Sequence, residues 1–488
     1  MTSDAPGPAT SDAPAPATAE APRRLHHGAV VVDGLRSTMQ LFAGVVIVAV
    51  VRGTPPGLAF LLALLSIAAG LGLGYARWRK TTYWLQDAAL HFRSGIFTPD
   101  EKIVPRARVQ AVDTATGPLQ RLFGVVEVRV QVPGASDADE IVLAAVTHEE
   151  AARLRLALGQ PAPAAPAERV VLGMRGLLLA ALTGPQISVA ISAVAGLYAL
   201  LHNVVDIERD GEGLLSRLDS PGTIALAVAA LLVAAYVLSF LGAIVLFAGF
   251  VVERDDRVLR IRSGLLARRA ISIPLERIDG VVIVEGLARG PFGLAALRLE
   301  SAAHGGEKAA GRTLLPLVRG HEAESVIARL VPALALEPGQ LERPPRRSLR
   351  RFVFGPLLAG GLVGAAAALF VASAAWPAIP LLALAGALTG LRAHRACGMR
   401  LAGDVVVVRE ARLARRTLLA RRRRLQEHSL SRTPLQARAA LRDLRITVGS
   451  GGEGRARHLE QATAEALFSA LRRSASAGPT PPPARPAV

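Results

Sequence analysis

Three times the chain carries one stretch, which in its second copy reads LRIRSGLLARRAISIPLERIDGVVIVEGLARGPFGLAALRL from Leu259 to Leu299. The first copy runs from Leu90 to Val130 and the third from Val406 to Ile446. The copies align without a gap, and their shared columns hold Arg93, Arg262 and Arg409; Arg108, Arg277 and Arg424; Ser94-Gly95 and Ser263-Gly264; Pro105 and Pro274; Phe123-Gly124 and Phe292-Gly293. Internal repetition on this scale predicts one structural module used three times.

The composition predicts a membrane protein with sizeable soluble parts. Of 488 residues, 51% are hydrophobic and 20% are charged, which is too apolar for an ordinary soluble protein and too charged for a pure bundle of spans. The single cysteine, Cys397, excludes an internal disulfide and a cysteine-based zinc site, so we expect a reducing compartment. The net charge of +18 fits nucleic-acid binding, attraction to anionic lipid, or arginine-rich codon usage, and does not choose among them.

Apolar segments come in three pairs, each ahead of one copy of the module. The pairs are 38–51 with 58–76, 177–201 with 223–252, and 352–375 with 378–391. A hydrocarbon core of ~30 Å needs about 20 helical residues, so the first and last segments must include flanking residues. No Asp, Glu, Lys or Arg interrupts these segments. We therefore predict six transmembrane helices in three hairpins.

These patterns divide the chain into eight parts. We predict disordered tails at 1–22 and 474–488, hairpins at 23–80, 161–252 and 336–396, and modules at 81–160, 253–335 and 397–473. Low-complexity Ala/Pro-rich tails cannot bury a core. The N-terminus lacks a basic segment followed by an apolar one, so we expect no cleaved signal peptide.

The charged flanks of the apolar segments predict the orientation. Basic residues gather on the module side of every hairpin, whereas the other side carries Arg52 and an acidic loop with Asp206, Glu208, Asp210 and Glu212. The positive-inside rule therefore places both termini and all three modules in the cytoplasm.

Two features inside the apolar segments each have two interpretations. The spacings Gly70-xxx-Gly74, Gly360-xxx-Gly364 and Gly386-xxx-Gly390 indicate either close helix contact or chance in Ala/Gly-rich segments. Pro185 breaks the third segment, and such a break either lines a transport site or is a simple kink.

Within each module, short alternating runs predict antiparallel strands. Examples are 258–262, 270–274 and 280–284 in the second copy, separated by turn residues. A C-terminal helix follows each time, at 151–158, 322–330 and 462–471, and the pattern Thr147-His-Glu-Glu150 predicts a capping box for the first of them. Strands closed by one helix predict a small α+β barrel or sandwich.

This order, with two spans ahead of each Arg-Ser-Gly, Pro-x-x-Arg and Phe-Gly signature, resembles the bacterial pleckstrin-homology-like (PH-like) domain membrane proteins. The resemblance covers about 23–473 and is specific in copies one and two, whereas copy three has Glu410-Ala411, Arg421 and Ala439-Ala440 at the signature positions. It implies a multi-span α-helical membrane protein of the bacterial plasma membrane, with six transmembrane helices in three hairpins and three cytoplasmic α+β PH-like domains. No catalytic residues come with the resemblance.

Motifs for enzyme chemistry are not convincing. Gly449-Ser-Gly-Gly-Glu-Gly454 matches GxGxxG, but the aligned positions of the other copies are hairpin turns and no helix opens directly after it. The histidines have no tight ligand spacing, and no GxSxG sequence supports a nucleophile. We expect no enzyme activity, cofactor or metal.

Arginine is concentrated in the third copy. The candidate lipid-binding residues are Arg409, Arg412, Arg415, Arg416, Arg421, Arg422, Arg423 and Arg424. Near a negatively charged leaflet, each basic side chain adds ~1 kcal/mol of attraction. A solvated surface is the alternative, and nucleic acid fits less well because no aromatic side chains interleave the arginines. We expect Arg108 and Arg277, in contrast, to pair with a local acid or a backbone carbonyl.

Together these features suggest a non-enzymatic membrane scaffold whose PH-like domains bind anionic lipid or partner proteins, with envelope stress or antimicrobial resistance as candidate processes. A transporter or channel subunit is the alternative, which the absence of charge inside the spans disfavours. The expected partner is a bilayer with anionic headgroups. A smaller protein of the same family and a second copy of this chain are further candidates, and no nucleic acid is expected.

Overall fold

The computed structural model describes residues 20–52, 55–96, 98–109, 111–132, 141–159, 166–184, 221–301, 313–337, 339–370 and 376–476. Two compact units make up the chain, Met1–Ala162 and Pro163–Val488. Most of both predicted tails, Pro185 and the acidic loop at 206–212 lie outside the described residues.

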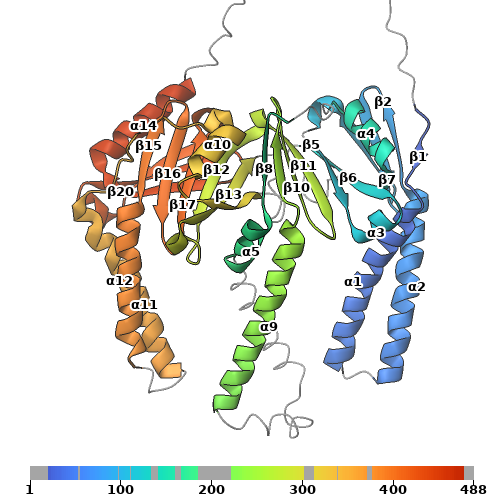
Figure 1. Ribbon diagram of the computed structural model, residues 1–488, viewed down its shortest axis with the longest axis horizontal. Coiled ribbons are helices and arrows are strands. Elements are labelled where there is room, and N and C mark those ends of the chain that lie inside the picture. Colours follow the sequence, from blue (N-terminus) through green and yellow to red (C-terminus); the bar gives the residue numbers. More distant parts are fainter. Residues whose placement is uncertain are drawn as a thin grey trace, which may run out of the picture. The chain divides into compact units, whose positions relative to one another are not determined.

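The first unit contains one helical hairpin and one module (Figure 1). The hairpin is α1 (Gly28–Arg52) and α2 (Pro56–Lys80). One antiparallel set of strands is β1 (Arg23–Arg24), β2 (Thr82–Gln86), β3 (Ala89–Ser94) and β4 (Asp100–Pro105). The other is β5 (Ala111–Thr116), β6 (Val125–Gln131) and β7 (Ile141–Thr147), with the short helix α3 (Pro118–Leu122) between β5 and β6. Helix α4 (His148–Ala157) closes the module, and the Thr147 side chain accepts the backbone N–H of Glu150 as the sequence predicts.

The second unit begins with a module of the same plan. Its helices are α5 (Met174–Leu182) and α9 (Pro221–Phe247). The first strands are β8 (Glu168–Val171), β9 (Val251–Arg254), β10 (Val258–Ser263) and β11 (Arg268–Pro274), all antiparallel. The next are β12 (Ile278–Glu285), β13 (Leu294–Ser301) and β14 (Thr313–Arg319), followed by helix α10 (Ala323–Leu330).

The third module completes the second unit and shares a sheet with its neighbour. Its hairpin is α11 (Leu349–Phe370) and α12 (Ala378–Ala396). The strands are β15 (Gly398–Ala402), β16 (Val405–Ala411), β17 (Arg415–Arg421), β18 (Leu425–Ser431), β19 (Leu441–Val448) and β20 (Glu453–Glu460), with α13 (Pro434–Ala437) before β19 and α14 (Gln461–Ser476) at the end. Strand β17 pairs with β12, which gives the six-stranded order β14-β13-β12-β17-β16-β15. The predicted order of strands followed by one helix is confirmed in every module.

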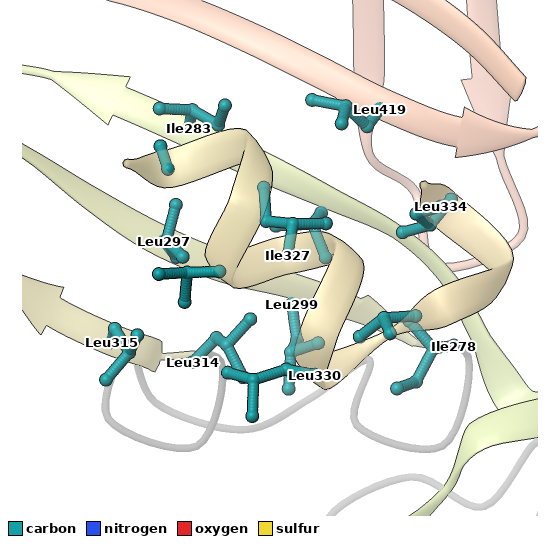
Figure 2. Packing of buried hydrophobic residues seen from close by; sticks show 14 of the residues in the cluster. Ile278, Ile283, Leu297, Leu299, Leu314, Leu315, Ile327, Leu330, Leu334 and Leu419 are labelled. Atoms are coloured by element: carbon teal, nitrogen blue, oxygen red, sulfur yellow. The ribbon is translucent and has the colours of Figure 1, made fainter. Parts of the chain in front are cut away.

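The core of the second module shows why alternation predicts these strands. In β13, Leu297 and Leu299 are buried whereas Arg298 between them is exposed, because successive side chains point to opposite faces. Helix α10 covers the buried face with Ile327 and Leu330 (Figure 2). The same cluster includes Val405, Val407 and Leu419 of the third module, so two copies of the repeat share one core.

The membrane prediction is confirmed only in part. Within the described residues, two helical segments are long and apolar enough to cross a membrane, Phe60–Lys80 and Arg346–Leu369, and Leu232–Phe247 is a shorter apolar helix. Two such segments are fewer than the six predicted. One reason is that α12 has only 19 residues, with His394 and Arg395 in its last turn. The third predicted span continues past Pro185, outside the described residues. Six spans therefore stay a prediction.

Close helix contact is the interpretation of the glycine spacing that the hairpins support. A methyl group at Gly360 would overlap the carbonyl oxygen of Leu382, and one at Gly386 would overlap that of Pro356. In the first hairpin, a methyl group at Gly70 would overlap Thr38. Small residues thus let the two backbones of the first and third hairpins approach closely, as in membrane helix pairs.

We predict that Gly386→Val destabilises the protein, because the added side chain has no room against α11. Overpacking of this kind costs about 1–3 kcal/mol. The matched control is Gly355→Val in α11, where a Cβ atom meets nothing within 4 Å. Thermal unfolding of the detergent-solubilised protein should show a lower midpoint for Gly386→Val only, and equal midpoints for the two variants would contradict the close packing.

Candidate functional site

The eight candidate arginines lie on two strands and one short helix of the third module. Arg409 is in β16, Arg412 is in the turn after it, and Arg415, Arg416 and Arg421 are in β17. Arg422, Arg423 and Arg424 form the 3-10 helix η9 (Arg422–Arg424). They do not form one uniform patch, because most of them are engaged in contacts within the protein.

Three of these arginines contact the second module. Arg415 Nη2 donates to Glu285 Oε1 at 2.5 Å. Arg421 Nη2 donates to the Leu275 carbonyl at 2.8 Å, and Arg424 Nη2 to the Glu276 carbonyl at 2.6 Å. Because β17 lies beside β12, these side chains reach across the boundary between two copies of the repeat. Their contacts therefore fix one module against the next.

Three more arginines bind groups of the third module itself. Arg409 Nε donates to Thr417 Oγ1 at 3.1 Å, Arg422 Nη2 to the Ala470 carbonyl, and Arg423 Nε to Asp404 Oδ2 at 3.0 Å. Burial lowers the pKa of both Arg409 and Arg421 below its ordinary value.

Arg412 and Arg416 are exposed like Arg415, Arg423 and Arg424, but their side chains form no hydrogen bond or ion pair among the described residues. Arg412 lies in the β16–β17 turn and Arg416 lies just after it. The pKa of the nearby Glu410 is raised by burial, and both arginines oppose that shift. Lipid binding by the eight arginines stays a prediction.

No hydrogen bond of the Arg277 side chain is found among the described residues, although the negative charge of the local Glu276 favours its charged form. Its Nη1 atom is buried and has no hydrogen-bond partner among the described residues, and burial lowers its pKa. The local Glu276 carbonyl accepts instead from Arg424, which occupies the same column of the third copy. Arg108 is exposed.

A second basic feature is a cleft of about 1380 Å³ where α11 enters the third module. It is lined by six arginines: Arg346, Arg347, Arg350, Arg351, Arg455 and Arg457. Its apolar lining includes Val353, Phe354, Leu357, Leu391 and Leu435, and among the described residues that line it Asp443 alone carries a carboxylate. The cleft is therefore strongly cationic, with an apolar wall that continues along an apolar helix.

Buried Asp443 organises the inner end of the cleft. Its carboxylate accepts from Gln436 Nε2, Arg455 Nη2 and the His458 backbone N–H, each at 2.7 Å. Gln436 is held by a capping box with Thr433 at the start of α13. Since the charge of Asp443 is paired with that of Arg455, the outer arginines leave the cleft with a net positive charge.

The outer arginines differ in their availability. Arg347 Nη2 donates to Glu460 Oε1 at 2.9 Å, and Arg351 Nη2 to the Leu435 carbonyl at 2.7 Å. Arg346 and Arg350 are exposed, and their side chains form no hydrogen bond or ion pair within the described part of the chain. Their four-residue separation places them on one side of the chain at the helix start. Both guanidinium groups are free to meet an anion.

Sequence reasoning interpreted Arg346, Arg347, Arg350 and Arg351 only as the basic flank of a span. The four-residue spacing of these arginines could have indicated a shared basic surface. Nothing in the sequence, however, placed Arg455 and Arg457 opposite them. The GxGxxG stretch, in contrast, was interpreted correctly, because it forms the turn between β19 and β20, where Val448 N–H donates to the Gly452 carbonyl. Among the described residues, no cluster of His, Cys, Asp and Glu could hold a metal ion.

Comparison with known proteins identifies the repeated unit. The family model for the bacterial PH domain matches residues 41–162, 193–333 and 354–475. The chain is 24% identical over 413 residues to the UPF0699 transmembrane protein YdbT of Bacillus subtilis (strain 168), covering 79% of this chain and 82% of that protein. No solved structure matches the chain. Each matched range combines part of a hairpin with the module after it.

His458, at the inner end of the cleft, predicts a pH dependence of stability. Its ring lies between Gln436 Nε2 at 2.8 Å and the edge of Phe352. Burial lowers the pKa of His458 below 6.5; Arg351 and Arg455 lower it too, and Asp443 opposes them. The folded protein prefers the neutral His458 ring, so this preference stabilises the fold fully at a pH above the pKa of His458 in the unfolded chain. The stabilisation is lost as the pH falls through the lower pKa of His458 in the folded protein.

We predict that the midpoint temperature of thermal unfolding decreases when the pH is lowered from about 7.5 to about 5.5. The decrease should be smaller in His458→Asn. Asparagine suits this position because the φ of His458 is 52° and asparagine tolerates positive φ. His321→Asn is the control, since that side chain is 74% exposed. The same pH dependence in wild type and His458→Asn would exclude His458 as its source.

Proposed function

The chain belongs to the bacterial PH domain family, and from that premise we propose that it is a non-enzymatic membrane scaffold whose third module binds an anionic phospholipid. The cleft at the start of α11 carries the proposal. It combines a cationic rim with an apolar wall at the end of a helix that is long and apolar enough to cross a membrane. A phospholipid has the same two parts, a charged headgroup and acyl chains.

The rim supplies the chemistry for a phosphate group. Guanidinium groups form short, charge-assisted and often bidentate hydrogen bonds with phosphate oxygens. Arg346 and Arg350 have their side chains available for this, whereas Arg347 and Arg351 are already bonded within the module. We therefore assign the headgroup contacts to Arg346 and Arg350.

The apolar wall supplies the contacts for an acyl chain. Phe354 is 63% exposed, and Val353 and Leu357 line the same cleft. A soluble phosphate compound would leave this wall in water, whereas an acyl chain would cover it. The chemistry of the whole cleft therefore fits a lipid better than a free phosphate.

The proposal places the modules in the cytoplasm, because the basic residues that flank the apolar segments lie on the module side. The scaffold role draws on the shared β12–β17 sheet and the shared core, which hold two modules as one body. A body of this kind can present a fixed surface to partner proteins.

We predict that the double variant Arg346→Gln/Arg350→Gln binds phosphatidylglycerol or cardiolipin about 30-fold more weakly, since each arginine contributes ~1 kcal/mol near an anionic headgroup. Binding is measured with the purified full chain in neutral nanodiscs titrated with a fluorescent anionic lipid. The matched control, Arg392→Gln/Arg395→Gln, removes the same charge from exposed positions at the end of α12, outside the cleft. An equal loss in both double variants would show a nonspecific effect of charge and would refute the cleft.

The orientation has its own test with an impermeant thiol reagent. In a Cys397→Ala background, we expect cysteine at Asp210 to react in intact cells and cysteine at His321 to react only after permeabilisation. His321 is suitable because its side chain is 74% exposed. Labelling of His321→Cys in intact cells would place the second module outside the cytoplasm.

A further inference from the structure

An exposed apolar turn adjoins the end of α9 in the second module. The backbone N–H of Gly264 donates to the Ala248 carbonyl at 2.8 Å, and that of Leu265 to the Val245 carbonyl at 2.9 Å. The last carbonyls of a helix have no partner within the helix, so the β10–β11 turn satisfies them. The turn therefore lies beside the last helical turn of an apolar helix. Leu265 and Leu266 are each 54% exposed there.

The third module repeats this arrangement with the same residues. Its β16–β17 turn contains Leu413-Ala-Arg-Arg416, which aligns with Leu266-Ala-Arg-Arg269 of the second module. Leu413 is 66% exposed. Ala411, at the start of the turn, packs against the cluster that joins the beginning of α11 to the end of α12. The turn thus adjoins the module side of its own hairpin, as in the second module.

A second apolar tip adjoins the first helix of each hairpin. In the second module, Phe292 is 74% exposed, and nearby Arg289 donates to the Ala180 carbonyl of α5 and to Thr183 Oγ1, each at 3.0 Å. Burial lowers the pKa of Arg289 to about 10, as expected for a guanidinium held in an apolar setting. In the third module, Leu435 is 65% exposed and its carbonyl accepts from Arg351 of α11.

The first module carries the corresponding tip at the start of α1. Leu122 is 77% exposed, and the next residue, Phe123, lies against Gly28 at the first turn of that helix. The residue aligned with Leu266 and Leu413 is Phe97, which lies outside the described residues.

Single exposed apolar side chains are ordinary on protein surfaces. These side chains are different because they recur at related places in the modules and always beside a hairpin helix. In both modules of the second unit, two arginines follow the exposed leucine of the turn. They are Arg268 and Arg269 after Leu266, and Arg415 and Arg416 after Leu413. Apolar side chains next to basic ones are typical of segments that lie in a membrane interface.

We propose that these apolar tips insert into the interface of the bilayer that the hairpins cross, so that each module rests on the membrane surface. The leucine and phenylalanine side chains enter the boundary between headgroups and acyl chains. Arg268, Arg269 and Arg416 extend to the phosphate level, as long basic side chains do at interfaces, whereas Arg415 stays paired with Glu285. The continuity of each tip with the end of an apolar helix identifies lipid, and not a soluble partner, as the occupant.

The test measures the depth of nitroxide spin labels in proteoliposomes made from the full chain. In a Cys397→Ala background, labels are attached at Leu266→Cys and Leu413→Cys. Asp256→Cys is the matched control, because Asp256 is exposed at the opposite end of β10 from Leu266. We expect the labels at 266 and 413 to lose accessibility to a water-soluble nickel complex and gain accessibility to oxygen, relative to the label at 256. Nickel accessibility at 266 and 413 equal to that at 256 would overturn the proposal.

The same labels distinguish this proposal from headgroup binding in the cleft. Insertion of the apolar tips should persist in vesicles of neutral phosphatidylcholine alone, whereas the cleft requires an anionic lipid. If the labels are shielded in neutral vesicles and the protein binds no anionic lipid, insertion of the tips is supported and lipid binding by the cleft is refuted. If the labels stay exposed and the protein binds anionic lipid, insertion of the tips is refuted. Normal size-exclusion profiles of the labelled proteins would confirm that the exposed positions tolerate the change.

Discussion

The backbone ladder between β12 and β17 is the constraint on which the second unit depends. Its register pairs Gly280 with Ala420 and Glu285 with Arg415. A methyl group at Gly280 would lie 2.6 Å from the Leu419 carbonyl oxygen, so the close approach of the two strands requires glycine there. Once the ladder is formed, Leu419 joins Ile283 in one core. Separating the modules would therefore cost both backbone hydrogen bonds and buried apolar area.

The same ladder explains where the third copy departs from the other two. Pro105 and Pro274 share a column with Arg421, and proline in the third copy could not make the contact that Arg421 makes with the Leu275 carbonyl. Arg424 likewise donates to the Glu276 carbonyl of the second module. The replacement of the signature proline by Arg421 thus falls at a residue that contacts the neighbouring copy, whereas Arg424 keeps the arginine of the aligned Arg108 and Arg277.

The sequence predicts what repeats or alternates, since those patterns follow from local geometry. Strand alternation predicted β10, β11 and β12, the aligned turns predicted the β19–β20 hairpin, and close helix contact was one of two interpretations of the spacing at Gly360 and Gly386. Pairing between copies cannot be predicted in this way, because a strand edge carries no mark of its partner. The cleft was missed for the same reason, since Arg350 and Arg455 meet only through the tertiary fold.

If the β16–β17 turn inserts as proposed, distance from the bilayer would separate the arginines of the third module by function. Strand β17 runs from Arg415 near the turn to Arg421 at its other end, and seven residues of strand span roughly 20 Å. The attraction of an anionic leaflet falls off within a Debye length, about 8–10 Å at physiological salt. If the turn meets the membrane, Arg412 and Arg416 lie within that range, whereas Arg421 to Arg424 lie beyond it. Arginines beyond the range would gain more from backbone carbonyl acceptors than from lipid, and Arg421, Arg422 and Arg424 each have such an acceptor.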